Sequence, residues 1–156
     1  IVDFGSIHLI PTLCVYMALL PMIYALAYPG SELNSLDFLA AVIAVLAVVI
    51  QIISDQQMYN FRKNLREPQT MKSGLWYYSR HPNYFGEILF WFSLFIFALA
   101  SNLSFLWLLI GTLIMYFLIA IASVSMMDKR SLERRPDFKE YMDSTPAIFI
   151  NVFKKG

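Results

Sequence analysis

The chain has 156 residues, of which 58% are hydrophobic and only 15% are charged. Soluble domains average about 45–50% apolar and about 25% charged residues, so this composition excludes an ordinary soluble globule as well as a disordered chain. The net charge of +1 gives no reason to expect nucleic acid as a partner, and the single cysteine, Cys14, excludes an internal disulfide framework. With one cysteine and two histidines, we expect no metal site.

Four apolar stretches, 7–28, 36–53, 84–100 and 103–127, approach or exceed the roughly 20 residues that a helix needs to cross a bilayer. Four such stretches leave too little polar surface for a soluble fold. The last two are separated only by two residues, which predicts a tight antiparallel hairpin. We therefore predict an all-α, polytopic membrane bundle of about four transmembrane helices. It would form a single membrane domain over 1–156 with one polar loop and an amphipathic C-terminal tail.

All basic residues fall in two segments, one between the second and third stretches and one after the fourth. With four crossings, both segments lie on the same side, and the positive-inside rule makes that side cytoplasmic. Each basic residue either serves only to orient the chain in the membrane or also binds a ligand. The distribution of basic residues does not distinguish these two interpretations. The two segments contain Arg62, Lys63, Arg66, Lys72 and Arg80, then Lys129, Arg130, Arg134, Arg135, Lys139, Lys154 and Lys155.

The segment 74–91, GLWYYSRHPNYFGEILFW, carries the strongest chemical signal. A residue before proline avoids the helical region, and proline suits the first position of a helix, so we predict that a helix begins at Pro82. Arg80 and His81 then stand beside the positive end of that helix and its unpaired N–H groups. This pattern predicts an anion site that suits a phosphate-bearing cofactor or a lipid head group.

Asn83, Tyr84 and Glu87 share one face of the predicted helix, because they are spaced three and four residues apart. Glu87 lies about one turn inside an apolar span, where a carboxylate is costly unless it is paired. We favour a functional role for Glu87. The alternative is a structural salt bridge to Arg80.

Two flanking segments add polar candidates. Asp55, Tyr59 and Arg62 lie on one helix face at the end of the second stretch, and they form either a polar cofactor wall or a solvated, snorkelling helix end. The tail DKRSLERRPDFKEYMDS follows the fourth stretch directly. It is either a surface helix on anionic lipid or a lid whose Arg134 and Arg135 close over phosphates.

The string SRHPNYFGE, followed by an apolar span with Trp91 and then by ERRPDFKEY, resembles the steroid 5-alpha-reductase superfamily. The resemblance covers roughly residues 54–153 and is closest to the branch of uncharacterised 5-alpha-reductase-like membrane proteins. The superfamily also contains the sterol C14 and C7 reductases and, more distantly, isoprenylcysteine carboxyl methyltransferase. One departure is Met58, where the sterol reductases carry a lysine.

The resemblance implies that NADPH binds from the cytoplasmic side. The cofactor contacts that it implies are Arg62, Trp76, Arg80, His81, Asn83, Tyr84, Asp128, Glu133, Arg134, Arg135 and Tyr141. Asp55, from the polar wall described above, is a further candidate contact. Tyr84 and Glu87 are the candidate catalytic residues, with Tyr84 as a proton donor. The substrate implied is lipophilic, with a steroid- or enone-like C=C bond, and the chain would be the C-terminal, cofactor-binding part of a longer reductase.

Two other functions are compatible with the sequence. One is an S-adenosylmethionine-dependent methyltransferase acting on a lipid or prenyl-cysteine. Glu87 after the glycine favours the reductase, because the methyltransferases usually carry an apolar residue there. The other is a non-catalytic membrane scaffold that uses the basic tail on anionic lipid head groups.

Overall fold

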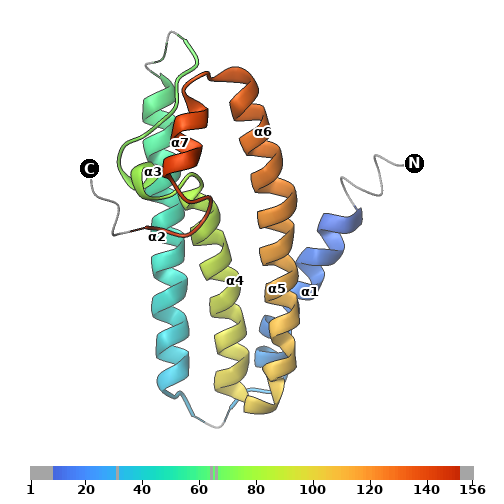
Figure 1. The fold of residues 1–156 in the computed structure, drawn as a ribbon. Helices are drawn as coiled ribbons and strands as arrows, with labels where there is room; N and C mark the ends of the chain where they lie inside the picture. Colours follow the sequence, from blue (N-terminus) through green and yellow to red (C-terminus); the bar gives the residue numbers. More distant parts are fainter. Residues whose placement is uncertain (1–8, 31, 64, 66, 152–156) are drawn as a thin grey trace. The chain divides into compact units, whose positions relative to one another are not determined.

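A computed structural model describes residues 9–30, 32–63, 65 and 67–151, and within these ranges every regular element is helical (Figure 1). The predicted all-α class is therefore confirmed. In chain order the elements are α1 (Ile10–Ala27), α2 (Ser35–Lys63), α3 (Leu75–Tyr78), α4 (Pro82–Ser101), the 3-10 helix η2 (Leu103–Leu108), α5 (Leu109–Phe117), the π-helix η3 (Leu118–Val124), α6 (Ser125–Arg134) and α7 (Phe138–Ser144).

Four helices are long and apolar enough to cross a membrane: Ile10–Ala27, Ser35–Lys63, Pro82–Ser101 and the composite helix Leu103–Arg134. This confirms the four predicted spans and the helix start at Pro82. The first two positions of the predicted stretch 7–28 lie outside the described residues, as do Arg66, Lys154 and Lys155.

Two helices are longer than their apolar stretches. Residues 54–63, SDQQMYNFRK, contain neither proline nor glycine and are rich in good helix formers, so α2 continues well past the end of the apolar run. The last span likewise continues as helix to Arg134. Both extensions carry polar side chains that the site uses.

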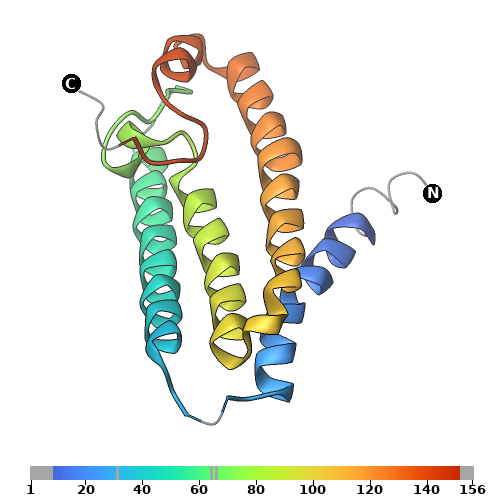
Figure 2. The same cartoon turned by 60° about the horizontal axis from the view of Figure 1, so that its bottom comes forward.

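The chain divides into two compact units. The first comprises Ile1–Leu46 and Ile88–Ile119, and the second comprises Ala47–Glu87 and Ala120–Gly156. In the first unit, α1 packs along α5 (Figures 1 and 2). Gly111 permits this close approach, because a Cβ there would lie 2.2 Å from the Met17 carbonyl oxygen. Buried Phe95, Ala98 and Leu108 form the core beside these helices.

Polar caps fix the turns of the first unit. The Asn34 side chain accepts the Leu36 N–H at 2.9 Å, and the Asp37 carboxylate accepts the Asn34 N–H at 2.9 Å. This reciprocal arrangement is a capping box, and it sets the start of α2. Asn102 caps η2 by accepting the Ser104 N–H at 2.9 Å. It is the single residue between the end of α4 and the start of η2. The short connection expected between the last two spans is therefore present.

In the second unit, α3 and the start of α4 both contact α2 closely, and these elements carry several of the polar residues of the site. A Cβ on Gly86 would lie 2.8 Å from the Ala47 carbonyl oxygen, so glycine lets α4 approach α2 closely. The Trp76 indole N–H donates to the Ser54 carbonyl at 3.0 Å, which fastens α3 to α2. As a result, α2, α3 and the start of α4 enclose one region of the second unit.

Candidate functional site

A C-terminal strap, residues 145–151, holds the turn that precedes α4. The backbone N–H groups of Arg80 and His81 donate to strap carbonyls at 2.9 and 3.0 Å. The Ser79 hydroxyl donates to the Ile148 carbonyl at 2.8 Å. The proline that follows keeps His81 out of the helical region, so the turn is extended enough to pair with the strap. The strap therefore sets the position of both side chains.

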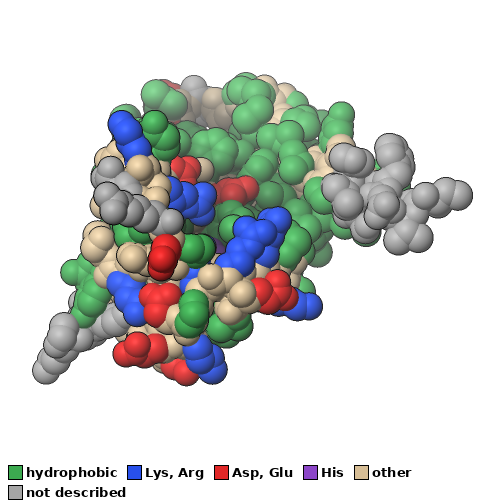
Figure 3. Space-filling view, turned by 90° about the horizontal axis from the view of Figure 1, so that it is seen from above, with side chains coloured by type: hydrophobic (Ala, Val, Ile, Leu, Met, Phe, Trp, Pro, Cys, Tyr) green, Lys and Arg blue, Asp and Glu red, His purple; other side chains and the backbone are tan. Residues whose placement is uncertain are grey.

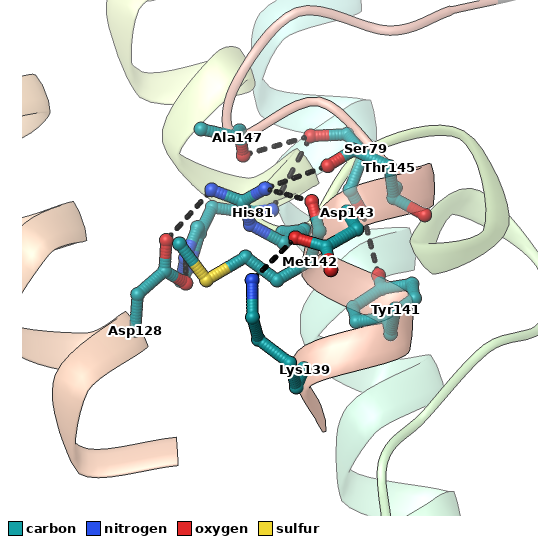
Figure 4. A network of polar contacts seen from close by, with 10 residues as sticks. Ser79, His81, Asp128, Lys139, Tyr141, Met142, Asp143, Thr145 and Ala147 are labelled. Carbon is teal, nitrogen blue, oxygen red and sulfur yellow. Dashed lines mark hydrogen bonds and ion pairs between the residues drawn. The ribbon is translucent and has the colours of Figure 1, made fainter. Parts of the chain in front are cut away.

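A buried network joins Arg80, His81 and Asp128, and Figure 4 shows how His81 and Asp128 lie in it. One guanidinium nitrogen of Arg80 donates to Asp128 Oδ2 at 2.8 Å, and Nε2 of His81 lies 2.9 Å from Asp128 Oδ1. The three side chains are only 8–10% exposed. The other terminal nitrogen of Arg80 donates to the Met142 and Thr145 carbonyls at 2.9 and 2.7 Å. The structure thus pairs Arg80 with Asp128, and the guanidinium also secures the C-terminal segment.

Beside this network lies a cavity of about 250 Å³. Its walls come from α2, the loop before α3, α3, the start of α4, α6 and α7. Nine of the thirteen candidate cofactor and catalytic residues line it, and they are Asp55, Arg62, Trp76, Arg80, His81, Asn83, Tyr84, Arg135 and Tyr141.

The other four predicted residues do not line this cavity. Asp128 is buried behind Arg80 and His81, where it contacts side chains of the protein. Glu87 is half-buried one turn along α4 from Tyr84, and Glu133 is exposed near the end of α6. Arg134 lines two adjoining cavities instead.

One end of the site is strongly basic. Two further cavities, of about 280 and 220 Å³, share Arg62 and Arg135 with the first. Arg130 and Arg134 complete their basic lining, which includes no carboxylate among the described residues. Burial and the neighbouring Arg62 lower the pKa of Arg135 below its ordinary value, as expected where like charges are crowded. On the face shown in Figure 3, basic side chains lie around a hollow, with acidic side chains among them. Such an end suits phosphate groups.

The other end of the site is aromatic and amide-bearing. Trp76, Tyr84 and Asn83 line it, and the ring of His81 stacks on that of Tyr84 with centroids 5.4 Å apart. Asn83 Oδ1 is buried and has no hydrogen-bond partner in the described part of the chain. A buried acceptor without a partner is costly, so this oxygen is a candidate for a ligand's N–H or O–H group.

Tyr141 supports this end from α7. Its hydroxyl donates to the backbone carbonyls of Trp76 and Ser79. Burial raises the pKa of Tyr141 above its ordinary value, so the phenol keeps its proton and remains a donor at neutral pH.

The loop before α3 is tied to the start of α7. The Thr70 hydroxyl donates to Asp137 Oδ1 at 2.8 Å, and Lys72 lies 3.5 Å from Asp137 Oδ2. Burial alone would raise the pKa of Asp137, but the hydrogen bond from Thr70 and the charge of Lys72 bring it below its ordinary value. These contacts hold Met71, a buried residue, in the cavity wall.

Sequence reasoning did not single out several lining residues. Arg130 could have been found, because it lies four residues before Arg134 and therefore on the same helix face. Thr70 and Met71 carry no periodic signal, because they lie in an irregular loop. Met127, Ser131 and Phe138 also line the cavity. In the sequence, Met127 looks like the end of the fourth apolar stretch, and Ser131 and Phe138 look like ordinary positions of the amphipathic tail.

A family model described as "Protein of unknown function (DUF1295)" matches residues 1–145. The chain is also 25% identical over 165 residues to "Uncharacterized protein C594.04c" of Schizosaccharomyces pombe (strain 972 / ATCC 24843). That alignment covers 92% of this chain and 47% of the relative, so the chain spans about half the length of the curated relative that it matches. No solved structure matches the chain.

Proposed function

Because the chain belongs to the DUF1295 family of proteins of unknown function, its activity must be argued from its site, and we propose that it is a membrane-embedded, NADPH-dependent reductase of a lipophilic C=C bond. Within the family, we place it in the branch of 5-alpha-reductase-like membrane proteins. The motif SRHPNYFGE at 79–87 and the tail motif ERRPDFKEY at 133–141 support that placement.

The observation that carries the proposal is the polarity of the site. Arginines line one end, and the rings of Trp76 and Tyr84 line the other, together with the unpartnered amide oxygen of Asn83. NADPH has the matching polarity, with three phosphates towards its adenosine half and a flat ring with a carboxamide at the far end. Arg62, Arg130, Arg134 and Arg135 would hold the phosphates.

The residues at the aromatic end fit the nicotinamide half. Trp76 and Tyr84 offer ring surfaces beside which a flat heterocycle can lie, and Asn83 Oδ1 would accept an N–H of the carboxamide. When bound, the cofactor supplies the hydride, and the protein supplies orientation and exclusion of water.

Tyr84 and Glu87 are the residues that we assign to proton transfer. The Tyr84 phenol holds a proton at the cavity wall, where it can be given to a substrate atom that gains negative charge. Glu87 is one helical turn further along α4 and can return a proton to Tyr84.

The proposal extends to the surroundings of the site. The end of α2 with the loop that follows it, and α6 with the segment that follows it, would face the cytoplasm, because they carry the basic residues. A lipophilic substrate would reach the site from the bilayer. The match to about half of a longer relative is compatible with the chain being the cofactor-binding part of a longer reductase.

The experiment that tests the proposal is calorimetric titration of the detergent-purified chain with NADPH, NADH and S-adenosylmethionine. We expect selective binding of NADPH. Asn83→Ala removes the unpartnered acceptor and should weaken NADPH binding about tenfold. Asn60→Ala, an exposed asparagine of α2 that does not line the cavity, is the matched control and should leave the affinity unchanged.

Other results would change the assignment. Binding of S-adenosylmethionine in place of NADPH would move the chain to the methyltransferases. Equal affinity of the wild type and Asn83→Ala for NADPH would reject the placement of the carboxamide. If none of the three compounds binds, the chain is not a complete reductase site, and a basic scaffold that binds anionic lipid becomes the stronger interpretation.

A further inference from the structure

Asp128 occupies an unusual place for a residue that the family resemblance implies to be a cofactor contact. It does not line any of the three cavities described above, and its side chain is only 8% exposed. Both of its oxygens are engaged, Oδ2 by Arg80 at 2.8 Å and Oδ1 by His81 at 2.9 Å. Asp128 therefore acts on the cavity only through these two neighbours.

The hydrogen-bonding chemistry of Asp128 determines the proton position on His81. The buried charge of Arg80 stabilises Asp128 as a carboxylate, which only accepts hydrogen bonds. The nitrogen of His81 that faces it, Nε2, must therefore carry a proton. In a neutral imidazole the other nitrogen, Nδ1, is then unprotonated and is a hydrogen-bond acceptor.

His81 also has a fixed ring plane. Its ring stacks on that of Tyr84 at an interplanar angle of 21°, and its backbone N–H is bound by the C-terminal strap. The structure shows no hydrogen bond to Nδ1 from the described residues, although His81 lines the cavity. The acceptor is therefore available to a molecule bound in the cavity.

We propose that Asp128 is a positioning residue that fixes His81 as the Nε2–H tautomer and thereby makes Nδ1 of His81 a hydrogen-bond acceptor for the bound ligand. The ligand group opposite His81 must then be a donor, such as a hydroxyl or an amide N–H. This inference uses the proposed function only to name NADPH, which carries ribose hydroxyls and a carboxamide, as the ligand.

Replacement of Asp128 by asparagine makes a sharp prediction. In D128N the amide oxygen must face Arg80, because a guanidinium only donates. The amide N–H₂ then faces His81 and donates to Nε2, so the ring must carry its proton on Nδ1. The variant should therefore reverse the tautomer and turn the acceptor at the cavity into a donor.

The tautomer can be read directly by ¹⁵N NMR of the histidine-labelled chain. The sequence has only His8 and His81, so His8→Gln leaves a single labelled ring. We expect the His8→Gln chain, recorded with its imidazole in the neutral form, to show a protonated Nε2 and an unprotonated Nδ1. Addition of D128N should exchange the two signals. Asp143→Asn changes an exposed aspartate that pairs with Lys139 on α7, and it is the control that should leave them unchanged.

NADPH provides the second readout. In the His8→Gln chain the Nδ1 signal should shift when NADPH is added, and D128N should weaken NADPH binding about tenfold while Asp143→Asn does not. A protonated Nδ1 in the His8→Gln chain overturns the inference, whether or not D128N folds. An unchanged tautomer in folded D128N also overturns it. The expected tautomers without any NADPH binding would support the positioning role and reject NADPH as the ligand.

Discussion

At the scale of single residues, Tyr141 links α7 to the parts of the chain that carry Trp76 and Ser79. Its hydroxyl donates to both of their carbonyls, and its ring is buried. Tyr141→Phe keeps the ring and removes the donor, which leaves two buried carbonyls short of a partner. We expect a loss of about 1–2 kcal/mol in the free energy of unfolding, measured by thermal or denaturant unfolding in detergent.

The same residue predicts a dependence on alkaline pH. The pKa of Tyr141 is raised in the folded chain, so its stabilising effect is fully present below the ordinary tyrosine pKa of about 10. It is lost as the pH rises from there towards the folded value. Wild type should therefore lose more stability above about pH 10 than Tyr141→Phe does. Parallel losses in the two proteins would contradict this role.

The lowered pKa of Asp137 predicts a loss of stability in acid rather than in alkali. Its pKa is lowered in the folded chain, so the stability it contributes is present above the ordinary aspartate pKa of about 3.9 and is lost as the pH falls through its own value. The pair with Lys72 is partly exposed, so the effect is about 1 kcal/mol or less. The stabilities of wild type and Asp137→Asn should differ at pH 7 and converge as the pH falls through the lowered pKa of Asp137.

At the scale of helices, two glycines set how closely neighbours approach. A Cβ at Gly111 would meet the backbone of α1, and a Cβ at Gly86 would meet the backbone of α2. Gly111→Ala and Gly86→Ala should each cost about 1–3 kcal/mol of stability, because the backbone cannot yield as a side chain can. Gly30→Ala is the control, since its nearest neighbour lies 3.7 Å away. If Gly111→Ala and Gly86→Ala lower the free energy of unfolding no more than Gly30→Ala does, the helices can move apart at little cost, which would contradict this role of the two glycines.

The positions of the long helices follow from local features of the sequence. Apolar length predicts the four spans, and the proline after His81 predicts the start of α4. The π-helix η3 was not predicted, because one extra residue per turn leaves no mark in a largely apolar run such as 118–124. The full length of α2 was also missed, since hydropathy marks where a helix leaves the apolar layer and not where its backbone hydrogen bonds end.

The site could be predicted only in part for a related reason. Motif spacing identifies residues on one helix face, and nine of the predicted residues do line one cavity. The partner of Arg80 was not predictable, because Asp128 is 48 residues away and is brought near by tertiary packing. The strap was missed as well, since the pairing of 145–151 with 78–81 depends on backbone groups that no side-chain pattern reveals.

At the scale of the whole molecule, the distribution of basic residues predicts the orientation in the membrane. In a Cys14→Ser background, a single cysteine introduced by Lys139→Cys should react with a membrane-impermeant maleimide only from the cytoplasmic side. A cysteine introduced by Glu32→Cys, in the loop between α1 and α2, should react only from the opposite side. Labelling of both from one side would contradict the four-span topology.

The strap also has a consequence for the order in which the protein matures. Chains are synthesised from the N-terminus, so residues 145–151 leave the ribosome after all four membrane-length helices. Until they pair with the turn at 79–81, Arg80 lacks the Thr145 carbonyl and the backbone N–H of His81 lacks the Ala147 carbonyl. A nascent chain can therefore insert its helices into the bilayer while its cavity is still unfinished. Emergence of residues 145–151 is therefore the step that allows the binding site to assemble.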